Sequence, residues 1–383
     1  MKRVTAYMGA ALCLVGVTGW LIFVRATPGT SGVFASSTSS LAREALRPSS
    51  PAYAESTASE STSVSAPSTQ TLRTKRSLSL SKSSVPATAS SATAPASPAA
   101  ATEVQGSPLA DVSASLRAAL VNIMCYAPAG SALHSISGSG VIIDPNGVIL
   151  TNAHVAQYFL LADRGVSCVV RSGSPATDEY QASLEYISPA WIQANAGVLS
   201  ENMPLGTGEH DYAFLAITGS ASSAPLPAQF PFMALALAPP ASGTPVVIAS
   251  YGAQFLNAAQ IQSHLSPTVV YGSVKGVYTF GTSTVDVLAL GGSAAAQEGS
   301  SGGGVANAWD KLVGIITTST VTGPTYDRSL NAITASYIQA DYLNESGTTI
   351  WQLLAQPPAD AAAQFAPHIP ALEATIMAAL GGS

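Results

Sequence analysis

Between about residues 120 and 340, apolar and polar positions form short β-rich runs that glycine or proline separates. Residues 141–143 and 148–150 are two such runs, and they flank the sequence DPNG at 144–147. Proline presets φ at the second turn position and glycine accepts a left-handed one, so this stretch predicts a hairpin. Further runs follow at intervals: VSCVVRS, YQASLEYIS, YAFLAIT, TPVVIASYG, TVVYGSVKG, VDVLAL, KLVGIITTST and LNAITASYI. Many short strands with Gly/Pro turns predict an all-β barrel or sandwich, and this region is long enough for two small barrels.

Helical spacing of apolar residues occurs mainly at the two ends of the strand region. SPLADVSASLRAAL precedes the first strand, and GTTIWQLLAQ and ALEATIMAALG follow the last one. We expect the C-terminal segments to form a helix that packs back on the barrels. Residues 185–208 read as a partly helical insertion between strands, either bordering a substrate cleft or forming a surface loop.

The N-terminus carries a long apolar run. Residues 7–24 follow Lys2 and Arg3 and are closed by Arg25. A run of about 18 residues is just long enough to span a bilayer, and the basic start favours an inside N-terminus with the body outside. The pattern predicts a membrane anchor in residues 1–25, the body being extracytoplasmic. The alternative is secretion after cleavage, because VFA at 33–35 resembles a cleavage site.

Residues 26–107 are dominated by Ser, Thr, Ala and Pro. They contain few apolar residues that could offset the entropy of ordering, so they predict a disordered linker. The expected organisation is therefore an anchor or signal over 1–25, this linker, a folded domain over 108–345 and a helical tail over 346–383.

The composition argues against one class of partner. The chain is 47% hydrophobic and 9% charged with a net charge of −6, and it has no basic stripe. Nucleic-acid binding is therefore not expected.

Two cysteines, Cys125 and Cys168, remain outside the apolar run. In an oxidising compartment they would form a disulfide worth roughly 3–4 kcal/mol, the alternative being two buried free thiols. No metal and no cofactor are predicted.

Three residues carry candidate chemistry. His154 lies in TNAHV after the hairpin, Asp211 precedes the apolar strand AFLAI, and Ser301 stands in EGSSGGGV. Alone, each fits an ordinary strand end, turn or loop. Together they supply the base, the orienting acid and the nucleophile that serine catalysis needs.

The same motifs carry a family resemblance. TNAHV resembles the histidine motif of trypsin-like serine peptidases, HDYAFLAI their aspartate strand and EGSSGGGV their Gly-x-Ser-Gly-Gly motif. The hairpin GSGVIIDPNGVILTNAHV is most similar to the Deg/HtrA branch, although too few residues follow the last strand for that branch's PDZ domain. The resemblance covers about residues 118–343. It implies two six-stranded antiparallel β-barrels with a C-terminal helix, and hydrolysis of protein or peptide substrates through an acyl-enzyme intermediate. It does not fix an oligomeric state.

The resemblance also assigns roles. Ser301 would be the nucleophile, His154 the base and Asp211 its orienting acid, with the N–H groups of Gly299 and Ser301 forming the oxyanion hole. Choosing Ser300 as the nucleophile would instead put Glu298 at the oxyanion-hole position, which a glycine suits better.

The wall of the specificity pocket and the neighbours of Asp211 complete the assignments. Ala295 and Thr317 would line a pocket for small or medium apolar side chains. His210 is expected to have no direct role. Glu209, His210 and Asp211 cannot converge on one metal ion as consecutive residues of a strand.

Alternatives differ in fold and in function. Gly-x-Ser-x-Gly around Ser301 also fits an α/β-hydrolase, with His368 and one of Asp327, Asp341 or Asp360 following, but alternating β and α segments are missing. An active endopeptidase is the leading function. A silent relative that binds peptides by strand addition, or a stalked surface protein, would leave the His-Asp-Ser set unexplained.

Overall fold

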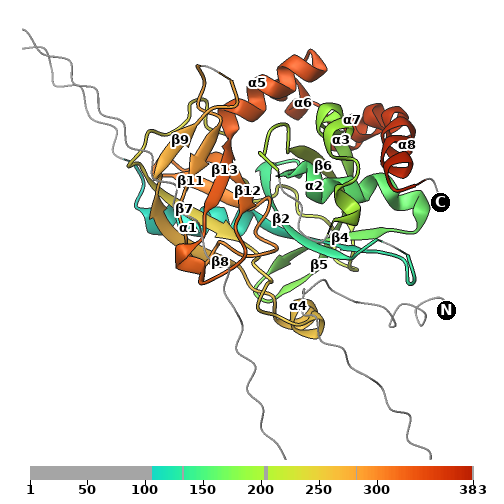
Figure 1. The fold of residues 1–383 in the computed structure, drawn as a ribbon, viewed down its shortest axis with the longest axis horizontal. Helices are drawn as coiled ribbons and strands as arrows, with labels where there is room; N and C mark the ends of the chain where they lie inside the picture. Colours follow the sequence, from blue (N-terminus) through green and yellow to red (C-terminus); the bar gives the residue numbers. More distant parts are fainter. Residues whose placement is uncertain (1–105, 132, 202–205, 282, 382–383) are drawn as a thin grey trace, which may run out of the picture. The chain divides into compact units, whose positions relative to one another are not determined.

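The computed structural model describes residues 106–131, 133–201, 206–281 and 283–381. Two antiparallel β-sheets with helices around them make up this part of the chain (Figure 1). The predicted all-β fold is confirmed. The predicted anchor over 7–24 and nearly all of the predicted linker lie outside the described residues. Within the described ranges, no helix has the length and apolar character that a bilayer crossing requires.

The first sheet is a closed six-stranded barrel with the order β1-β2-β3-β6-β5-β4. The hairpin predicted from DPNG joins β2 to β3. Gly147 has φ +96° there, and its N–H donates to the carbonyl of Asp144 at 3.0 Å. The strands are β1 (Leu120–Tyr126), β2 (Ile136–Asp144), β3 (Val148–Thr151), β4 (Ser167–Gly173), β5 (Ala176–Ile187) and β6 (Ala213–Ser220).

A disulfide joins two neighbouring strands of this barrel. Cys125 of β1 lies directly opposite Cys168 of β4 in the antiparallel register, and the two sulfurs are bonded. The bridge closes a loop of 43 residues. It therefore cross-links the two strands that complete the barrel.

The second sheet has seven strands in the order β8-β7-β11-β12-β13-β10-β9. Only Val274 and Lys275 separate its two edge strands, so one bent segment supplies both edges. The sequence predicts TVVYGSVKG as a single strand, and the family resemblance implies a second six-stranded barrel. The structure instead has seven strands in an open order, in which β8 and β9 lie at opposite edges and do not pair with each other. The strands are β7 (Pro245–Ser250), β8 (Thr268–Ser273), β9 (Gly276–Tyr278), β10 (Val287–Ala289), β11 (Gly304–Asn307), β12 (Lys311–Ser319) and β13 (Leu330–Thr334).

The predicted helical segments at the two ends of the strand region form α1, α6 and α8, and the structure adds helices that the sequence did not predict, α2, α4 and α7. LNAITASYI is not all strand, because the Thr334 hydroxyl accepts a hydrogen bond from the Tyr337 N–H and begins helix α5 there. Helix α4, begun by a capping box at Asn257 and Gln260, was not predicted. Helix α7, which lies between the two predicted C-terminal segments, packs back against β5 and β6, whereas α8 contacts α3 (Figure 1). The helices are α1 (Leu109–Ala119), α2 (Ala153–Ala156), α3 (Pro189–Asn195), α4 (Ala258–His264), α5 (Ala335–Ser346), α6 (Ile350–Leu354), α7 (Pro358–Phe365) and α8 (Ile369–Ala379).

The first barrel buries one carboxyl group without a partner. Glu185 of β5 is 3% exposed, and neither of its side-chain oxygens has a hydrogen-bond partner in the described part of the chain. Burial, and secondarily the charge of Asp144, raises the pKa of Glu185 from 4.5 to about 8. Ionising this group in the folded state therefore costs on the order of 5 kcal/mol.

We expect Glu185→Gln to stabilise the protein at alkaline pH. The folded state holds the Glu185 proton up to a higher pH than the unfolded chain does. The free energy of unfolding of the wild type should therefore fall as pH rises from about 4.5 to about 8. Urea unfolding at pH 4.5 and 8.5 should show little change in the variant at the lower pH. A gain of several kcal/mol is expected at the higher one. Glu179→Gln, on the same strand but partly exposed, should show no such gain; equal effects would contradict the burial argument.

Candidate active site

His154 and Asp211 lie side by side on the first barrel. His154 belongs to α2, directly after β3, and Asp211 ends the loop before β6. His154 Nδ1 lies 2.8 Å from Asp211 Oδ2, and the His154 backbone N–H donates to Asp211 Oδ1 at 3.0 Å. The carboxylate thus fixes both the ring and the backbone of the histidine, and Nε2 is left as the ring nitrogen for other chemistry.

Two more side chains hold Asp211 in place. The Thr317 hydroxyl donates to Asp211 Oδ2 at 2.7 Å, and the Asn152 amide donates to the Asp211 carbonyl at 2.9 Å. Asp211 is only 4% exposed. Thr317 is on β12 of the second sheet, so the acid is fixed from both sheets.

The electrostatics of the pair follow from burial and charge. Burial alone lowers the pKa of His154, but the charge of Asp211 and their hydrogen bond outweigh it and raise that pKa above its ordinary value. Burial raises the pKa of Asp211, but the charge and hydrogen bonds of His154 and the bond from Thr317 hold it below its ordinary value. An ionised acid thus supports a histidine that readily accepts a proton.

Ser301 lies in the loop before β11, and Ser139 of β2 fastens that loop to the first barrel. The Ser139 N–H donates to the Ser301 carbonyl at 2.7 Å, and its hydroxyl donates to the Gly299 carbonyl at 2.8 Å. The Ser139 carbonyl accepts from the hydroxyl of Thr151, three residues before His154, at 2.7 Å. The serine loop is therefore tied to the strand that leads to the histidine. Within the described residues no hydrogen bond joins Ser301 Oγ to His154, a bond that is often loose in unliganded sites.

Two glycines of this loop have a backbone that other residues avoid. Gly299 has φ +88° and Gly302 has φ +84°. A Cβ on Gly302 would overlap the Ser139 carbonyl and lie 2.6 Å from Thr151 Oγ1. Neither the Gly299 N–H nor the Ser301 N–H donates to an acceptor in the described residues. Both donors that the sequence assigned to an oxyanion hole are therefore unused.

The two residues predicted to line the specificity pocket are both buried. Ala295 is fully buried, and the Thr317 hydroxyl is engaged with Asp211. The buried guanidinium of Arg328 donates to the Ala296 carbonyl, to the Gly323 carbonyl and to Gln254 Oε1. It joins the segment before Ser301 to the segment after β12. The pocket role of Ala295 and Thr317 remains a prediction.

The comparisons with known proteins identify the domain. Residues 138–315 match the family model of the trypsin-like peptidase domain. The chain carries a trypsin-like serine peptidase domain. His154, Asp211 and Ser301 all lie inside the matched stretch. The protein is accordingly a serine-type endopeptidase, a hydrolase acting on peptide bonds. Membership of the Deg/HtrA branch remains a prediction.

Two solved structures are similar to this chain. The active form of the Rv3671c protease from M. tuberculosis is 19% identical over 67% of this chain and 96% of that chain, with a TM-score of 0.41. The inactive form of a serine-to-alanine mutant of Rv3671c from M. tuberculosis H37Rv is 17% identical over 62% of this chain and 91% of that chain, with a TM-score of 0.39. No curated protein matches the sequence.

Sequence reasoning missed Ser139 of the candidate site and gave Thr317 a different role. Ser139 stands in the run GSGVI, but its partners Gly299 and Ser301 are 160 or more residues away. Only the packing of the two sheets brings them together. A hydroxyl between two glycines at the start of a hairpin strand was the one signal that could have marked it.

Proposed function

We propose that the peptidase domain cuts peptide bonds through Ser301, His154 and Asp211. The observation that carries the proposal is the His154–Asp211 pair, in which a buried carboxylate holds Nδ1 at 2.8 Å. This pair fixes the tautomer that leaves Nε2 able to accept a proton. The loop of Ser301 is tied by Ser139 to the strand before His154, which supports placing the nucleophile beside that base.

The reaction balances with these groups alone. Ser301 Oγ forms a bond to the scissile carbonyl carbon while His154 Nε2 takes its proton. The tetrahedral intermediate then breaks its C–N bond, and His154 gives the proton to the leaving amine. Water next attacks the acyl ester, with His154 again as base, and the acid product and free Ser301 result. The N–H groups of Gly299 and Ser301 would stabilise the oxyanion in both steps.

We further propose that the substrates are proteins outside the cytoplasm. Support comes from the apolar run over residues 7–24 behind a basic start, and from the Cys125–Cys168 disulfide. Disulfides persist mainly in oxidising compartments. The preferred arrangement is a tethered domain, with secretion after cleavage as the alternative.

A fluorophosphonate probe tests the proposal. It reacts with activated serines, so treating the purified full-length protein should label one serine per chain. Mass spectrometry of the labelled peptide should place the adduct on Ser301. The neighbouring Ser300 serves as an internal control, because it is 1% exposed and its hydroxyl is bonded to Ser250. If the folded protein is not labelled, the result would favour the alternative of a catalytically silent relative that binds peptides. Labelling of a serine other than Ser301 would exclude Ser301 as the nucleophile.

A further inference from the structure

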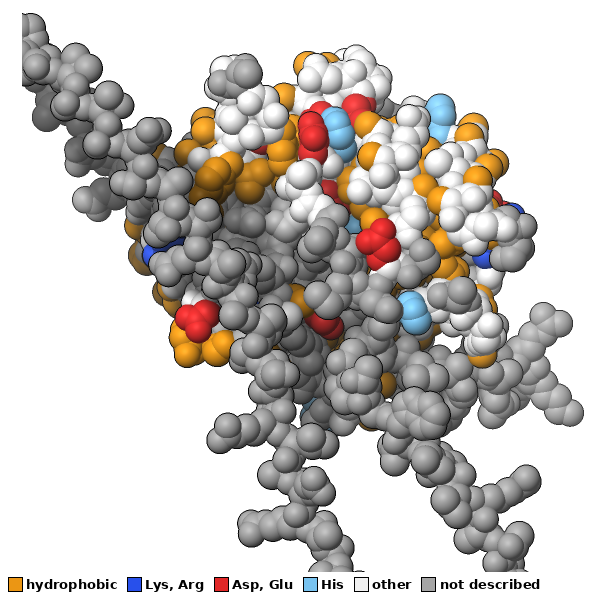
Figure 2. Space-filling view, in the orientation of Figure 1, with side chains coloured by type: hydrophobic (Ala, Val, Ile, Leu, Met, Phe, Trp, Pro, Cys, Tyr) orange, Lys and Arg blue, Asp and Glu red, His pale blue; other side chains and the backbone are white. Residues whose placement is uncertain are grey.

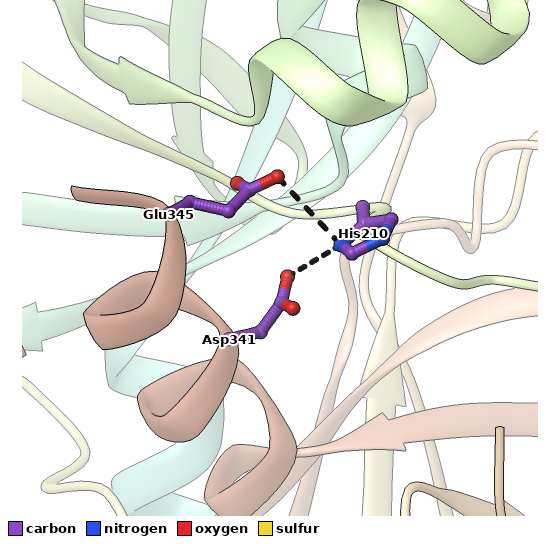
Figure 3. A group of neighbouring side chains, drawn as sticks. All are labelled: His210, Asp341 and Glu345. Carbon is purple, nitrogen blue, oxygen red and sulfur yellow. Dashed lines mark hydrogen bonds and ion pairs between the residues drawn. The ribbon is translucent and has the colours of Figure 1, made fainter. Parts of the chain in front are cut away.

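Three potential ligand groups converge on a surface beside, but separate from, the peptidase site. His210 comes from the loop before β6, and Asp341 and Glu345 come from one face of α5, one turn apart (Figure 3). His210 Nδ1 lies 2.7 Å from Asp341 Oδ2 and 3.7 Å from Glu345 Oε1. One ligand atom from each residue lies within 4.8 Å of the other two. The loop and the helix thus bring together one imidazole and two carboxylates from positions more than 130 residues apart.

The charges in this cluster are not balanced by the protein. Within the described residues, Asp341 and Glu345 form ion pairs only with His210, and no lysine or arginine reaches them. On the face drawn in Figure 2, carboxylates gather next to a histidine while lysine and arginine side chains lie towards the edges. Asp341 and Glu345 side chains are only 10% and 14% exposed. A cation would offset this excess of negative charge.

Hydroxyl groups orient the Glu345 carboxylate in the way that second-sphere residues orient metal ligands. The Tyr186 hydroxyl and the Ser188 hydroxyl donate to the two oxygens of Glu345. The Glu209 carboxylate lies 4.0 Å from His210 Nε2, the ring nitrogen that faces away from the cluster. In the metal-free structure the 2.7 Å contact with Asp341 keeps the ring proton on Nδ1. When a metal ion replaces that proton, Nε2 carries the ring proton, and Glu209 is a carboxylate near enough to accept it after a small movement.

The backbone at His210 is also unusual. Its φ is +57°, a left-handed conformation that non-glycine residues rarely adopt. The Tyr337 hydroxyl of α5 accepts a hydrogen bond from the His210 N–H and helps to hold this conformation. Backbone strain of this kind is concentrated at functional sites. It directs the His210 ring towards α5, whereas the next residue, Asp211, faces His154.

We propose that His210, Asp341 and Glu345 bind a divalent transition-metal ion, with Zn²⁺ as the preferred ion. The ligands are His210 Nδ1 and one carboxylate oxygen from each acid, and solvent fills the fourth position of a tetrahedral site. Ligand atoms about 2.0–2.2 Å from zinc lie roughly 3.3–3.5 Å apart. The 2.7 Å contact therefore opens and the 3.7 Å contact closes slightly on binding. The absence of a thiolate and the presence of an imidazole favour Zn²⁺ over softer or purely oxygen-preferring ions.

The site lies one residue from Asp211. A bound ion would fasten the Asp211 loop to α5 and so steady the acid of the peptidase site. The proposal itself does not depend on catalysis by Ser301, because its test reads metal binding directly.

Calorimetric titration of the metal-stripped full-length protein with Zn²⁺ is the test, with bound zinc counted by elemental analysis after dialysis. One saturable zinc per chain is expected, and Mg²⁺ at the same concentration should not compete. His210→Ala and Asp341→Asn should each weaken binding by at least about 100-fold, since each removes a direct ligand.

Control variants separate this site from others. His154→Ala removes the other histidine–aspartate pair, and His264→Ala removes an exposed histidine of α4. Both should retain the zinc. Circular dichroism of the zinc-free variants checks the fold, and Glu345→Gln replaces any ligand variant that fails it. Absence of saturable binding, or equal binding by wild type and His210→Ala, would overturn the proposal. Loss of zinc in His154→Ala alone would also do so.

Discussion

Replacing Ser301 with alanine is expected to abolish peptide hydrolysis. The variant loses the only atom that forms the acyl bond in the proposed mechanism, while the loop keeps its hydrogen bonds, because Ser139 binds the backbone of residues 299 and 301 and not the Ser301 hydroxyl. Removal of the nucleophile in a serine hydrolase lowers kcat about 10⁶-fold. The measurement is kcat and KM on an unfolded protein or a fluorogenic peptide library, beside fluorophosphonate labelling.

Ser300→Ala is the matched control for this experiment. It removes the same atom from the adjacent residue, whose hydroxyl lies 3.1 Å from Ser250 Oγ in the interior. We expect its kcat to remain within about tenfold of the wild type, with a modest loss of stability from one buried hydrogen bond. If Ser300→Ala were the silent variant and Ser301→Ala the active one, the nucleophile assignment would be reversed. If both kept full activity, the serine mechanism would be excluded.

Local sequence patterns were enough to predict the hairpin before His154 and the loop that holds Ser301. The DPNG hairpin predicts the strand pair that ends at His154, because Pro145 and Gly147 set their own turn geometry. The run EGSSGGGV likewise predicts a loop with left-handed glycines. Such features depend on neighbours in sequence, so a single sequence reveals them.

Contacts between the sheets could not be predicted in this way. The bond from Thr317 to Asp211 spans 106 residues, and its signal in sequence is one threonine in an ordinary β-strand. The sequence predicts LNAITASYI as one strand, because the spacing of its few apolar residues fits a strand as well as a helix. The Thr334 cap and the burial of Ile338 and Tyr342 make its second half a helix. That error also hid the face of α5 that meets His210.

Replacing Asp211 with asparagine is expected to lower kcat/KM by about 10⁴-fold with little change in KM. The asparagine is nearly isosteric, so Thr317 and Asn152 keep their positions, but an amide N–H can now face His154 Nδ1. The histidine then holds its proton on Nε2 and cannot accept one from Ser301. The loss of charge also removes what raises the pKa of His154, while burial continues to lower it.

The pH profile of Asp211→Asn distinguishes this role from a structural one. In the wild type we expect kcat/KM to fall as pH drops through the pKa of His154, which lies above the ordinary value of 6.5. In the variant that acid limb should move to lower pH, because protonating His154 is no longer favoured by a neighbouring carboxylate. Glu373→Gln, which removes the acid of the Arg164–Glu373 ion pair on α8, should shift neither the rate nor the limb. A variant that loses activity with an unmoved limb would mean that Asp211 supports the fold and does not tune the base.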